Sequence, residues 1–203
     1  MTDYMDAIRE FFDGLSDSQN MNQFGDEDTT KLKEQMAIWN LKPGDVILET
    51  GSGTGRLTTH LLKIIGYNGM VYCVDFAIKM LLKAKVRGLG GNVKLIQADA
   101  SALPLADKCC DVVLCFSAFP HFSDKEKALA EFHRVLKPSG KLLVSHLARR
   151  GKINAFHSKE GRPIGNDLIP PNEEMRRLLS EAGFRGVTIT DDDRGYLVIA
   201  HTV

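Results

Sequence analysis

Short apolar runs recur along the chain from Val46 onward, and stretches with helical spacing separate them. The runs occupy residues 46–50 (VILET), 70–75 (MVYCVD), 93–99 (VKLIQAD), 111–117 (DVVLCFS) and 141–147 (KLLVSHL). Because they are apolar almost throughout, we expect them to be strands of a parallel sheet that is buried on both faces. Helices that would cover those faces are predicted at residues 55–65, 78–86, 125–136 and 172–182.

The end of the chain departs from this alternation. Two further strand-like runs, 187–192 (VTITDD) and 196–202 (YLVIAHT), are separated only by Asp193, Arg194 and Gly195. So short a connection predicts a hairpin and therefore antiparallel pairing. The fold class we expect is α/β, with a mostly parallel seven-stranded sheet, helices on both faces and a C-terminal antiparallel hairpin.

Two segments lie outside this pattern. Residues 1–40 contain an amphipathic helix from Tyr4 to Leu15, an acidic linker and a second helix that ends near Trp39. Residues 148–171 form an excursion punctuated by Gly and Pro, and loops of that length in compact domains are usually functional or mobile. We therefore expect a single domain, 1–203, with a helical cap (1–40), a ligand-binding core (41–147), a substrate-side excursion (148–171) and a C-terminal helix and hairpin (172–203).

Charge excludes one class of partner. The 203 residues carry 26 basic and 26 acidic side chains, so the chain lacks the positive field that attracts nucleic acid. The balance is uneven: residues 1–30 hold eight acids against Arg9, and residues 147–162 hold five bases against Glu160. These segments can attract each other, or both can be solvated surface.

The four cysteines show neither a disulfide framework nor zinc-ligand spacing. The N-terminus lacks the apolar segment of a signal peptide, and no run is long enough for a membrane span. We expect a cytoplasmic protein with no membrane contact, and a homodimer is compatible with the sequence.

The strongest local motif is the segment 49–55, Glu-Thr-Gly-Ser-Gly-Thr-Gly, between an apolar strand and a helix. Glycines there permit a sharp turn and let a ligand approach backbone N–H groups. Dinucleotide enzymes use Gly-x-Gly-x-x-Gly, whereas here Arg56 takes the place of the third glycine and Glu49 suits a pyrophosphate poorly. The motif favours a methyltransferase, with a nucleotide enzyme and a simple strand–helix turn as alternatives.

Carboxylates follow the next two strands. Asp75 ends the second run, 24 positions after Gly51 (75 − 51), where a carboxylate can accept from both hydroxyls of a ribose. Phe76 can then pack on a flat base, and Asp99, after the third run, can accept from an adenine amino group. Asp75 can also cap the next helix, which is compatible with ligand binding. Ligands of open α/β sheets sit at these carboxyl ends of strands.

These segments resemble the class I S-adenosylmethionine-dependent methyltransferases, of the methyltransferase type 11 group that includes the quinone-biosynthesis C-methyltransferases. The resemblance covers residues 42–147 and rests on VILETGSGTGRLT, VYCVDFAIKML, IQADASALPLADKCCDVVLCFSAF and ALAEFHRVLKPSGKLLVSH. It implies a Rossmann-like fold, S-adenosylmethionine as cofactor, and methyl transfer to a small-molecule acceptor that the sequence does not identify. Residues 117–120 lack the Asn-Pro-Pro-Tyr pattern of enzymes that methylate exocyclic or amide nitrogens.

The resemblance also implies roles for individual residues. Glu49, Gly51 and Gly53 would line the methionine and ribose side, and Asp75 would hold the ribose. Phe76 and Ala100 would flank the adenine, Asp99 would meet its amino group, and the backbone at Phe116 and Ser117 would lie near the methionyl part. The full cofactor-binding set expected is Glu49, Gly51, Ser52, Gly53, Asp75, Phe76, Asp99, Ala100, Phe116 and Ser117.

Three histidines map to the rim where the acceptor would enter: His121, His146 and His157. One of them can act as a base if the acceptor must lose a proton, since imidazole titrates near neutral pH. Alternatives are a divalent metal held together with Asp124 or Asp167, and purely structural hydrogen bonding. The ligand spacing does not favour a metal, so none is assigned.

Three hypotheses remain at this point: an active small-molecule methyltransferase, a nicotinamide-dinucleotide oxidoreductase, and a non-catalytic module that binds S-adenosylmethionine. We also expect the acidic N-terminal stretch and the basic residues 148–162 to close over the pocket as a lid. Removal of residues 1–25 would then raise the Michaelis constant for the acceptor more than it weakens cofactor binding.

Overall fold

The computed structural model describes residues 2–203, and the side chains from residue 4 onward. The strands are β1 (Val46–Thr50), β2 (Met70–Asp75), β3 (Val93–Gln97), β4 (Cys110–Phe116), β5 (Leu136–His146), β6 (Arg185–Asp192) and β7 (Gly195–His201). The N-terminal helices are α1 (Thr2–Leu15), α2 (Gln19–Asn22) and α3 (Asp26–Trp39). The others are α4 (Thr58–Ile65), α5 (Ile78–Val86), the 3-10 turn η1 (Phe119–His121), α6 (Lys125–Val135), α7 (Arg150–Glu160) and α8 (Asn172–Glu181).

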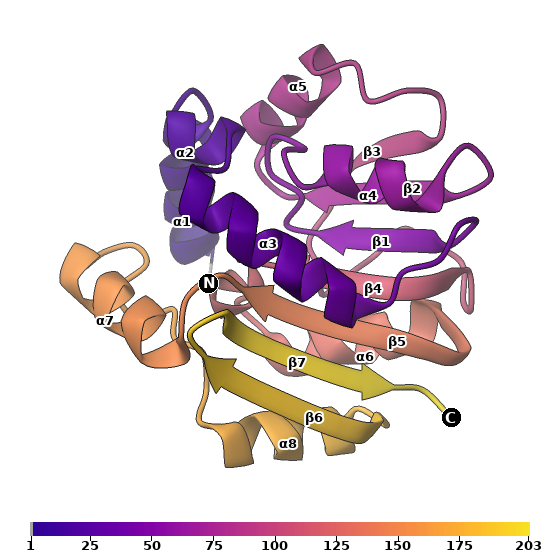
Figure 1. Cartoon of the computed structure of the whole chain (residues 1–203). Helices are drawn as coiled ribbons and strands as arrows, with labels where there is room; N and C mark the ends of the chain where they lie inside the picture. Colours follow the sequence, from indigo (N-terminus) through magenta and orange to yellow (C-terminus); the bar gives the residue numbers. More distant parts are fainter. Residues whose placement is uncertain (1) are drawn as a thin grey trace.

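The strands form one seven-stranded sheet in the order β3-β2-β1-β4-β5-β7-β6 (Figure 1). Strands β1 to β5 pair in parallel, whereas β7 pairs antiparallel with both β5 and β6. The predicted parallel sheet with a C-terminal antiparallel hairpin is therefore confirmed. The chain order reverses between β1 and β4, and ligands bind at such a switch point in open α/β sheets.

Each face of the sheet carries its own core because successive strand residues point to opposite sides. On one face, Ile47 and Val71 pack with Leu32 and Trp39 of α3 and Leu61 of α4. On the other face, Leu48 and Val74 belong to a cluster that α6 and α8 complete. Strands buried in this way on both sides explain the nearly continuous apolar runs.

The N-terminal helices α1 and α2 and the excursion helix α7 gather at the end of the sheet where β1, β4 and β5 terminate (Figure 1). The cap and the excursion thus lie beside the carboxyl ends of the parallel strands, where a ligand site is expected. None of the helices within residues 2–203 has the length and apolar character needed to cross a membrane.

Three differences from the sequence-based expectation have a clear physical reason or position. Helix α4 begins at Thr58 rather than at residue 55, since Gly55 has a φ of 74°, outside the right-handed helical region. Strand β5 begins at Leu136, five residues before the apolar run, and a register shift lies opposite it at Cys110/Val112. Residues 148–171, expected as an irregular excursion, contain α7, whose polar sequence has no apolar stripe to reveal it.

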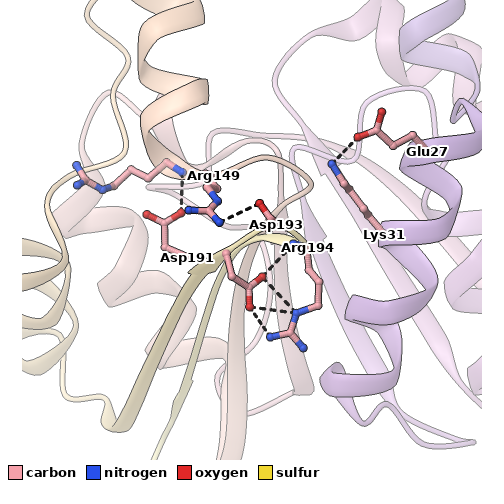
Figure 2. A network of polar contacts seen from close by, with 8 residues as sticks. Glu27, Lys31, Arg149, Asp191, Asp193 and Arg194 are labelled. Atoms are coloured by element: carbon pink, nitrogen blue, oxygen red, sulfur yellow. Dashed lines mark hydrogen bonds and ion pairs between the residues drawn. The ribbon is translucent and has the colours of Figure 1, made fainter.

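The oppositely charged segments do not pair with each other directly. Figure 2 shows Arg149 paired with Asp193 of the hairpin turn at 2.9 Å and Lys31 paired with Glu27 within α3. Asp17, in the acidic segment, pairs instead with Lys83 of α5. Among the described residues, no ion pair joins residues 4–30 to residues 147–162. The acidic segment reaches the excursion instead through a hydrogen bond from Tyr4 to Asp167, which lies beyond the basic residues 147–162.

Candidate active site

A cavity of about 970 Å³, its open mouth included, lies at the carboxyl ends of the central strands. Its walls come from the glycine loop after β1, the ends of β2 and β4, the loop after β3, helix α1 and the turn η1. The cavity is lined by every residue of the expected cofactor-binding set: Glu49, Gly51, Ser52, Gly53, Asp75, Phe76, Asp99, Ala100, Phe116 and Ser117. The fold therefore brings residues 49 to 117 together around one space.

The glycine loop is shaped by its backbone. Gly51 has a φ of 66°, and a Cβ at this position would collide with the Cβ of Ala118 from the loop after β4. Only glycine adopts this positive φ and allows this close approach to Ala118 without strain. The loop is held against β2 because Ser52 N donates to the carbonyl of Val74 at 3.0 Å and Gly53 N donates to Asp75 Oδ2 at 2.8 Å.

Asp75 connects the loop to the next helix. Besides the bond from Gly53, its Oδ1 accepts from Ala77 N at 2.9 Å, which fixes the start of α5. The side chain is therefore a ligand candidate that also holds the turn before α5, whose N-cap residue is Ala77; the capping role that the sequence allowed for Asp75 is wrong. Burial raises the pKa of Asp75 to about 6, against the lowering effect of these two backbone bonds.

Glu49 is the second buried carboxylate of the cavity. Its Oε2 accepts from Thr58 Oγ1 at 2.6 Å, and burial raises its pKa to about 7. The negative charge of Asp75 contributes in the same direction. Two buried acids with raised pKa values in one cleft are typical of a binding or catalytic site.

The far end of the cavity is flat and partly aromatic. Phe76 meets Phe12 of α1 edge to face, with ring centroids 6.2 Å apart. Asp99 is fixed by bonds from the backbone N and the hydroxyl of Ser101, both 2.8 Å to Oδ1. Ala100 is 7% exposed and adds an apolar wall. A planar, polar-edged group fits between these residues.

The end of β4 supplies the opposite wall. Ser117 has a φ of 54°, a left-handed conformation that non-glycine residues seldom adopt, and its N–H donates to the carbonyl of Ser145 at 2.8 Å. Phe116 packs edge to face against Trp39 of α3 at 6.2 Å and against Phe24 at 5.9 Å. Backbone strain at such a place is often functional.

Sequence reasoning expected the N-terminal segment to cover the pocket but did not single out the residues that line it. Met5, Phe12 and Met21 line the cavity, although nothing in their sequence indicated which surface they cover. Arg56, noted only as a departure from the dinucleotide motif, donates to the carbonyl of Asn20 and lies 4.3 Å from the ring centroid of Phe24. Arg56, which replaces the third glycine of the dinucleotide motif, therefore links the glycine loop to the N-terminal cap.

The three predicted histidines lie together, but they differ in their access to the cavity. His121 lines it, and its ring centroid is 4.9 Å from that of His157. His157 is buried, and its Nδ1 bonds to the backbone carbonyl of Asp167. His146 is 4% exposed, its Nε2 has no partner among the described residues, and burial lowers its pKa to about 3.

The residues weighed as metal ligands have other partners. Asp124 accepts from Lys127 N at 2.9 Å and caps α6. Asp167 accepts from Tyr4 and bonds to His121 at 2.8 Å. Across residues 2–203, no group of three or more His, Cys, Asp or Glu side chains has a geometry suited to a metal ion.

Comparison with known sequences identifies the family. A sequence model of the methyltransferase domain matches residues 48–144. The chain is 32% identical to the ubiquinone/menaquinone biosynthesis C-methyltransferase UbiE of Klebsiella pneumoniae over 173 residues, which cover 72% of this chain and 69% of that protein. The UbiE protein of Vibrio cholerae is 34% identical, with 72% of this chain and 66% of that protein covered.

Solved structures agree with this relationship. A possible histamine N-methyltransferase from Thermotoga maritima is 26% identical, with a TM-score of 0.66 over 85% of this chain and 88% of that one. A putative methyltransferase of Haloferax volcanii, solved in complex with the activator Trm112, is 19% identical and has the same fold, with a TM-score of 0.78 over 94% of this chain and 97% of that one. The loop, the cavity and these relatives together place the chain in the class I S-adenosylmethionine-dependent methyltransferases.

Proposed function

We propose that the cavity holds S-adenosylmethionine with its ribose on Asp75 and its adenine between Phe76 and Ala100. Asp99 then accepts from the adenine amino group, and the methionyl part lies along Glu49, Gly51 and the backbone at Phe116 and Ser117. The observation that carries this proposal is the bond between Gly53 N and Asp75 Oδ2, which joins the glycine loop to the acid at the end of β2. The nicotinamide and non-catalytic alternatives are not favoured, because the family relationship points to methyl transfer.

The chemistry of the donor set fits this cofactor. S-adenosylmethionine supplies a methyl group that is activated by a positively charged sulfonium. Glu49 and Asp75 are buried carboxylates, and their pKa values are raised because no positive charge or sufficient set of hydrogen-bond donors offsets their loss of hydration. A cation and a pair of hydroxyl donors would provide that compensation. The hydroxyl oxygen of Ser52 is also buried without a partner among the described residues, and Ser52 lines the same cavity.

The acceptor we propose is a small molecule. Helix α1 covers part of the cavity through Met5 and Phe12, so a large polymer would meet the cap before the site. The balanced charge of the chain argues against nucleic acid. All walls come from one chain, so the homodimer that the sequence allows is not needed to complete the site. The four free cysteines suit work in the reducing cytoplasm.

We further propose that helix α1 of the cap (1–40) and the excursion (148–171) cover the acceptor side of the domain. This proposal is supported by the hydrogen bond from Tyr4 to Asp167, and by the edge-to-face contact, at 4.9 Å, of Phe12 with His121, which both line the cavity. Ion pairing between the segments, which the sequence suggested, is not the contact that joins them. Polar and aromatic contacts take its place.

A labelling experiment tests the choice of acceptor. Purified protein is incubated with S-adenosylmethionine labelled in its methyl group and with a bacterial cell extract that has been divided by ultrafiltration. The expected result is label transferred to the small-molecule fraction, absent with the Asp75→Ala variant. Label found only in the protein or nucleic-acid fraction would refute a small-molecule acceptor.

A further inference from the structure

His121 has the surroundings of a base that is held in one orientation. It lies in η1, immediately after β4, and lines the cavity. Its Nδ1 is 2.8 Å from Oδ2 of Asp167, whose side chain is only 5% exposed. An ionised carboxylate can only accept, so Nδ1 carries the proton and Nε2 keeps its lone pair.

The free nitrogen is accessible from the cavity. Nε2 of His121 has no hydrogen-bond partner among the described residues, and it is not among the fully enclosed polar atoms that lack one. Nε2 of the neighbouring His146, by contrast, is enclosed. Of the three predicted histidines, His121 is also the one that lines the cavity, so it is the candidate to contact a substrate.

Asp167 is itself fixed by contacts from two other elements. Its Oδ1 accepts from the hydroxyl of Tyr4 in α1, and its backbone carbonyl accepts from His157 in α7. Two residues farther on, Ile169 exchanges two hydrogen bonds with the side chain of Asn154, at 2.9 and 3.0 Å. The loop that carries the carboxylate is thus tied to α7 at Asp167 itself and again two residues beyond it.

The turn that carries His121 is held as well. Lys125 of α6 donates to the carbonyls of Pro120 at 2.9 Å and Phe122 at 3.1 Å, one on each side of the histidine. Phe12 packs edge to face on its ring. Preorganised groups of this kind lose little entropy when they react.

Burial favours the neutral form of His121. Burial lowers its pKa, the hydrogen bond and charge of Asp167 oppose this, and His157 and Lys125 add to the lowering. His146 of β5 and Tyr4 of α1 complete the titratable groups around the cluster. A neutral imidazole is the form that can take a proton.

We propose that His121 is the proton acceptor for the methyl acceptor and that Asp167 is its positioning residue. The inference rests on the proposed function of the cavity and deepens it. The nucleophilic atom of the acceptor forms a bond to the methyl carbon while the carbon–sulfur bond breaks, its electron pair passing to sulfur. The proton of the acceptor moves to Nε2 of His121, and Asp167 stabilises the resulting imidazolium.

This assignment defines a class of acceptor. A base is useful only where the attacking atom bears a proton that it must lose, as in a phenol, a thiol or an acidic carbon. A tertiary amine has no such proton and gains nothing from His121. The acceptor is therefore a weak acid that is mainly protonated near neutral pH.

The test uses the intact protein saturated with S-adenosylhomocysteine, with 4-nitrophenol as a probe whose ionised form absorbs visible light. The wild type is expected to raise the ionised fraction of the phenol above that in buffer, and His121→Gln to abolish the rise. Asp167→Asn is expected to reduce it, and His201→Gln, an exposed histidine on β7, to leave it unchanged. No rise with the wild type, or an equal rise with His121→Gln, would overturn the proposal.

Nitrogen NMR of histidine-labelled protein provides a second readout that needs no probe. In the wild type, His121 is expected to be neutral at neutral pH with its proton on Nδ1, and Asp167→Asn to lose this fixed tautomer. A proton on Nε2 in the wild type would contradict the assignment. Calorimetric binding of S-adenosylhomocysteine by each variant checks the cavity separately, so a failure of the base and a failure of the cofactor site are distinguishable.

Discussion

Glu49 and Asp75 are buried carboxylates of the cavity whose pKa values are raised. Glu49 is 1% exposed and Asp75 7%, and each must be ionised to attract a cationic ligand. Neither has a basic partner at ion-pair distance among the described residues. An ionised carboxylate buried without a basic partner lowers the stability of the fold. Functional sites commonly retain such groups because they increase affinity for a charged ligand.

Replacement of Glu49 by Gln is expected to stabilise the protein while weakening its ligand binding. Folding raises the pKa of Glu49 from 4.5 to about 7, so the folded state binds its proton more tightly than the unfolded state. The stability of the wild type therefore falls as pH rises through this window, and Gln removes that loss. We expect a gain of about 1–3 kcal/mol above pH 7 and little gain near pH 4, measured by urea denaturation.

The same variant is expected to bind S-adenosylmethionine at least about tenfold more weakly. Thr58→Val is the matched control, because it removes the hydroxyl that bonds to Glu49 but keeps the carboxylate. A Glu49→Gln protein that is less stable than the wild type at pH 8, yet binds normally, would show that the carboxylate is structural.

For single residues, local sequence motifs were sufficient to predict which side chains line the cofactor side of the cavity, but not which ones meet on the acceptor side. Gly51, Asp75 and Asp99 each lie at or within two residues of the carboxyl end of a strand, so adjacent strands bring them to one edge of the sheet without further information. The contact between His121 and Asp167 spans 46 positions, and that of Tyr4 with Asp167 spans 163. Pairs so far apart in the chain are set by the packing of α1 and the excursion, which no local pattern specifies.

At the scale of the elements, the close contact between the glycine loop and the turn after β4 predicts that Gly51 tolerates no side chain. Gly51→Ala would place a Cβ against Ala118 in a backbone conformation of positive φ. Gly44 also has a positive φ, 87°, but a Cβ there meets no atom within 4 Å. We expect Gly44→Ala to cost about 1 kcal/mol of stability, and Gly51→Ala to cost about 1–3 kcal/mol more.

Thermal unfolding of the two variants measures this difference. Gly51→Ala is also expected to weaken binding of S-adenosylhomocysteine, since the loop must shift away from Ala118, and Gly44→Ala is expected to leave it unchanged. Equal losses of stability in the two variants would mean that the loop and the turn after β4 are not in close contact.

The N-terminal segment is expected to act in two parts. Residues 20–22 offer backbone carbonyls to Arg56, Thr54 and Arg87 around the glycine loop. Helix α1 reaches His121 and Asp167 on the acceptor side, and its contact with the cofactor side is the edge-to-face packing of Phe12 on Phe76. Deletion of residues 1–15 should therefore weaken S-adenosylhomocysteine binding less than about threefold, and deletion of residues 1–25 by at least about tenfold.

Calorimetric titration of both truncated proteins measures these affinities, with circular dichroism to verify their folding. The design refines the lid expected from the sequence, because residues 16–25 belong to the cofactor side. Equal weakening by the two deletions would contradict this division of the cap.

For the molecule as a whole, hydrophobic pattern was sufficient to predict the sheet. The boundaries of β1, β2 and α5 agree with the sequence-based ranges, because burial on both faces leaves a continuous apolar run and a clear stop. Helix α7 escaped prediction because it is held by polar contacts such as Asn154 with Ile169 rather than by an apolar stripe. The residues expected to bind the cofactor lie in the core, where pattern is predictive, whereas we expect the cap and the excursion to determine which acceptor is bound.

Calorimetric titration with S-adenosylmethionine and S-adenosylhomocysteine tests the central claim most directly. The account predicts binding by the wild type with a Kd in about the micromolar range, and a loss of at least about tenfold with Asp75→Ala. Asp107→Ala, in an exposed ion pair with Arg134, is the control and is expected to bind normally. Absence of binding by the wild type to either ligand, with binding of NADH instead, would contradict the assignment of the glycine loop.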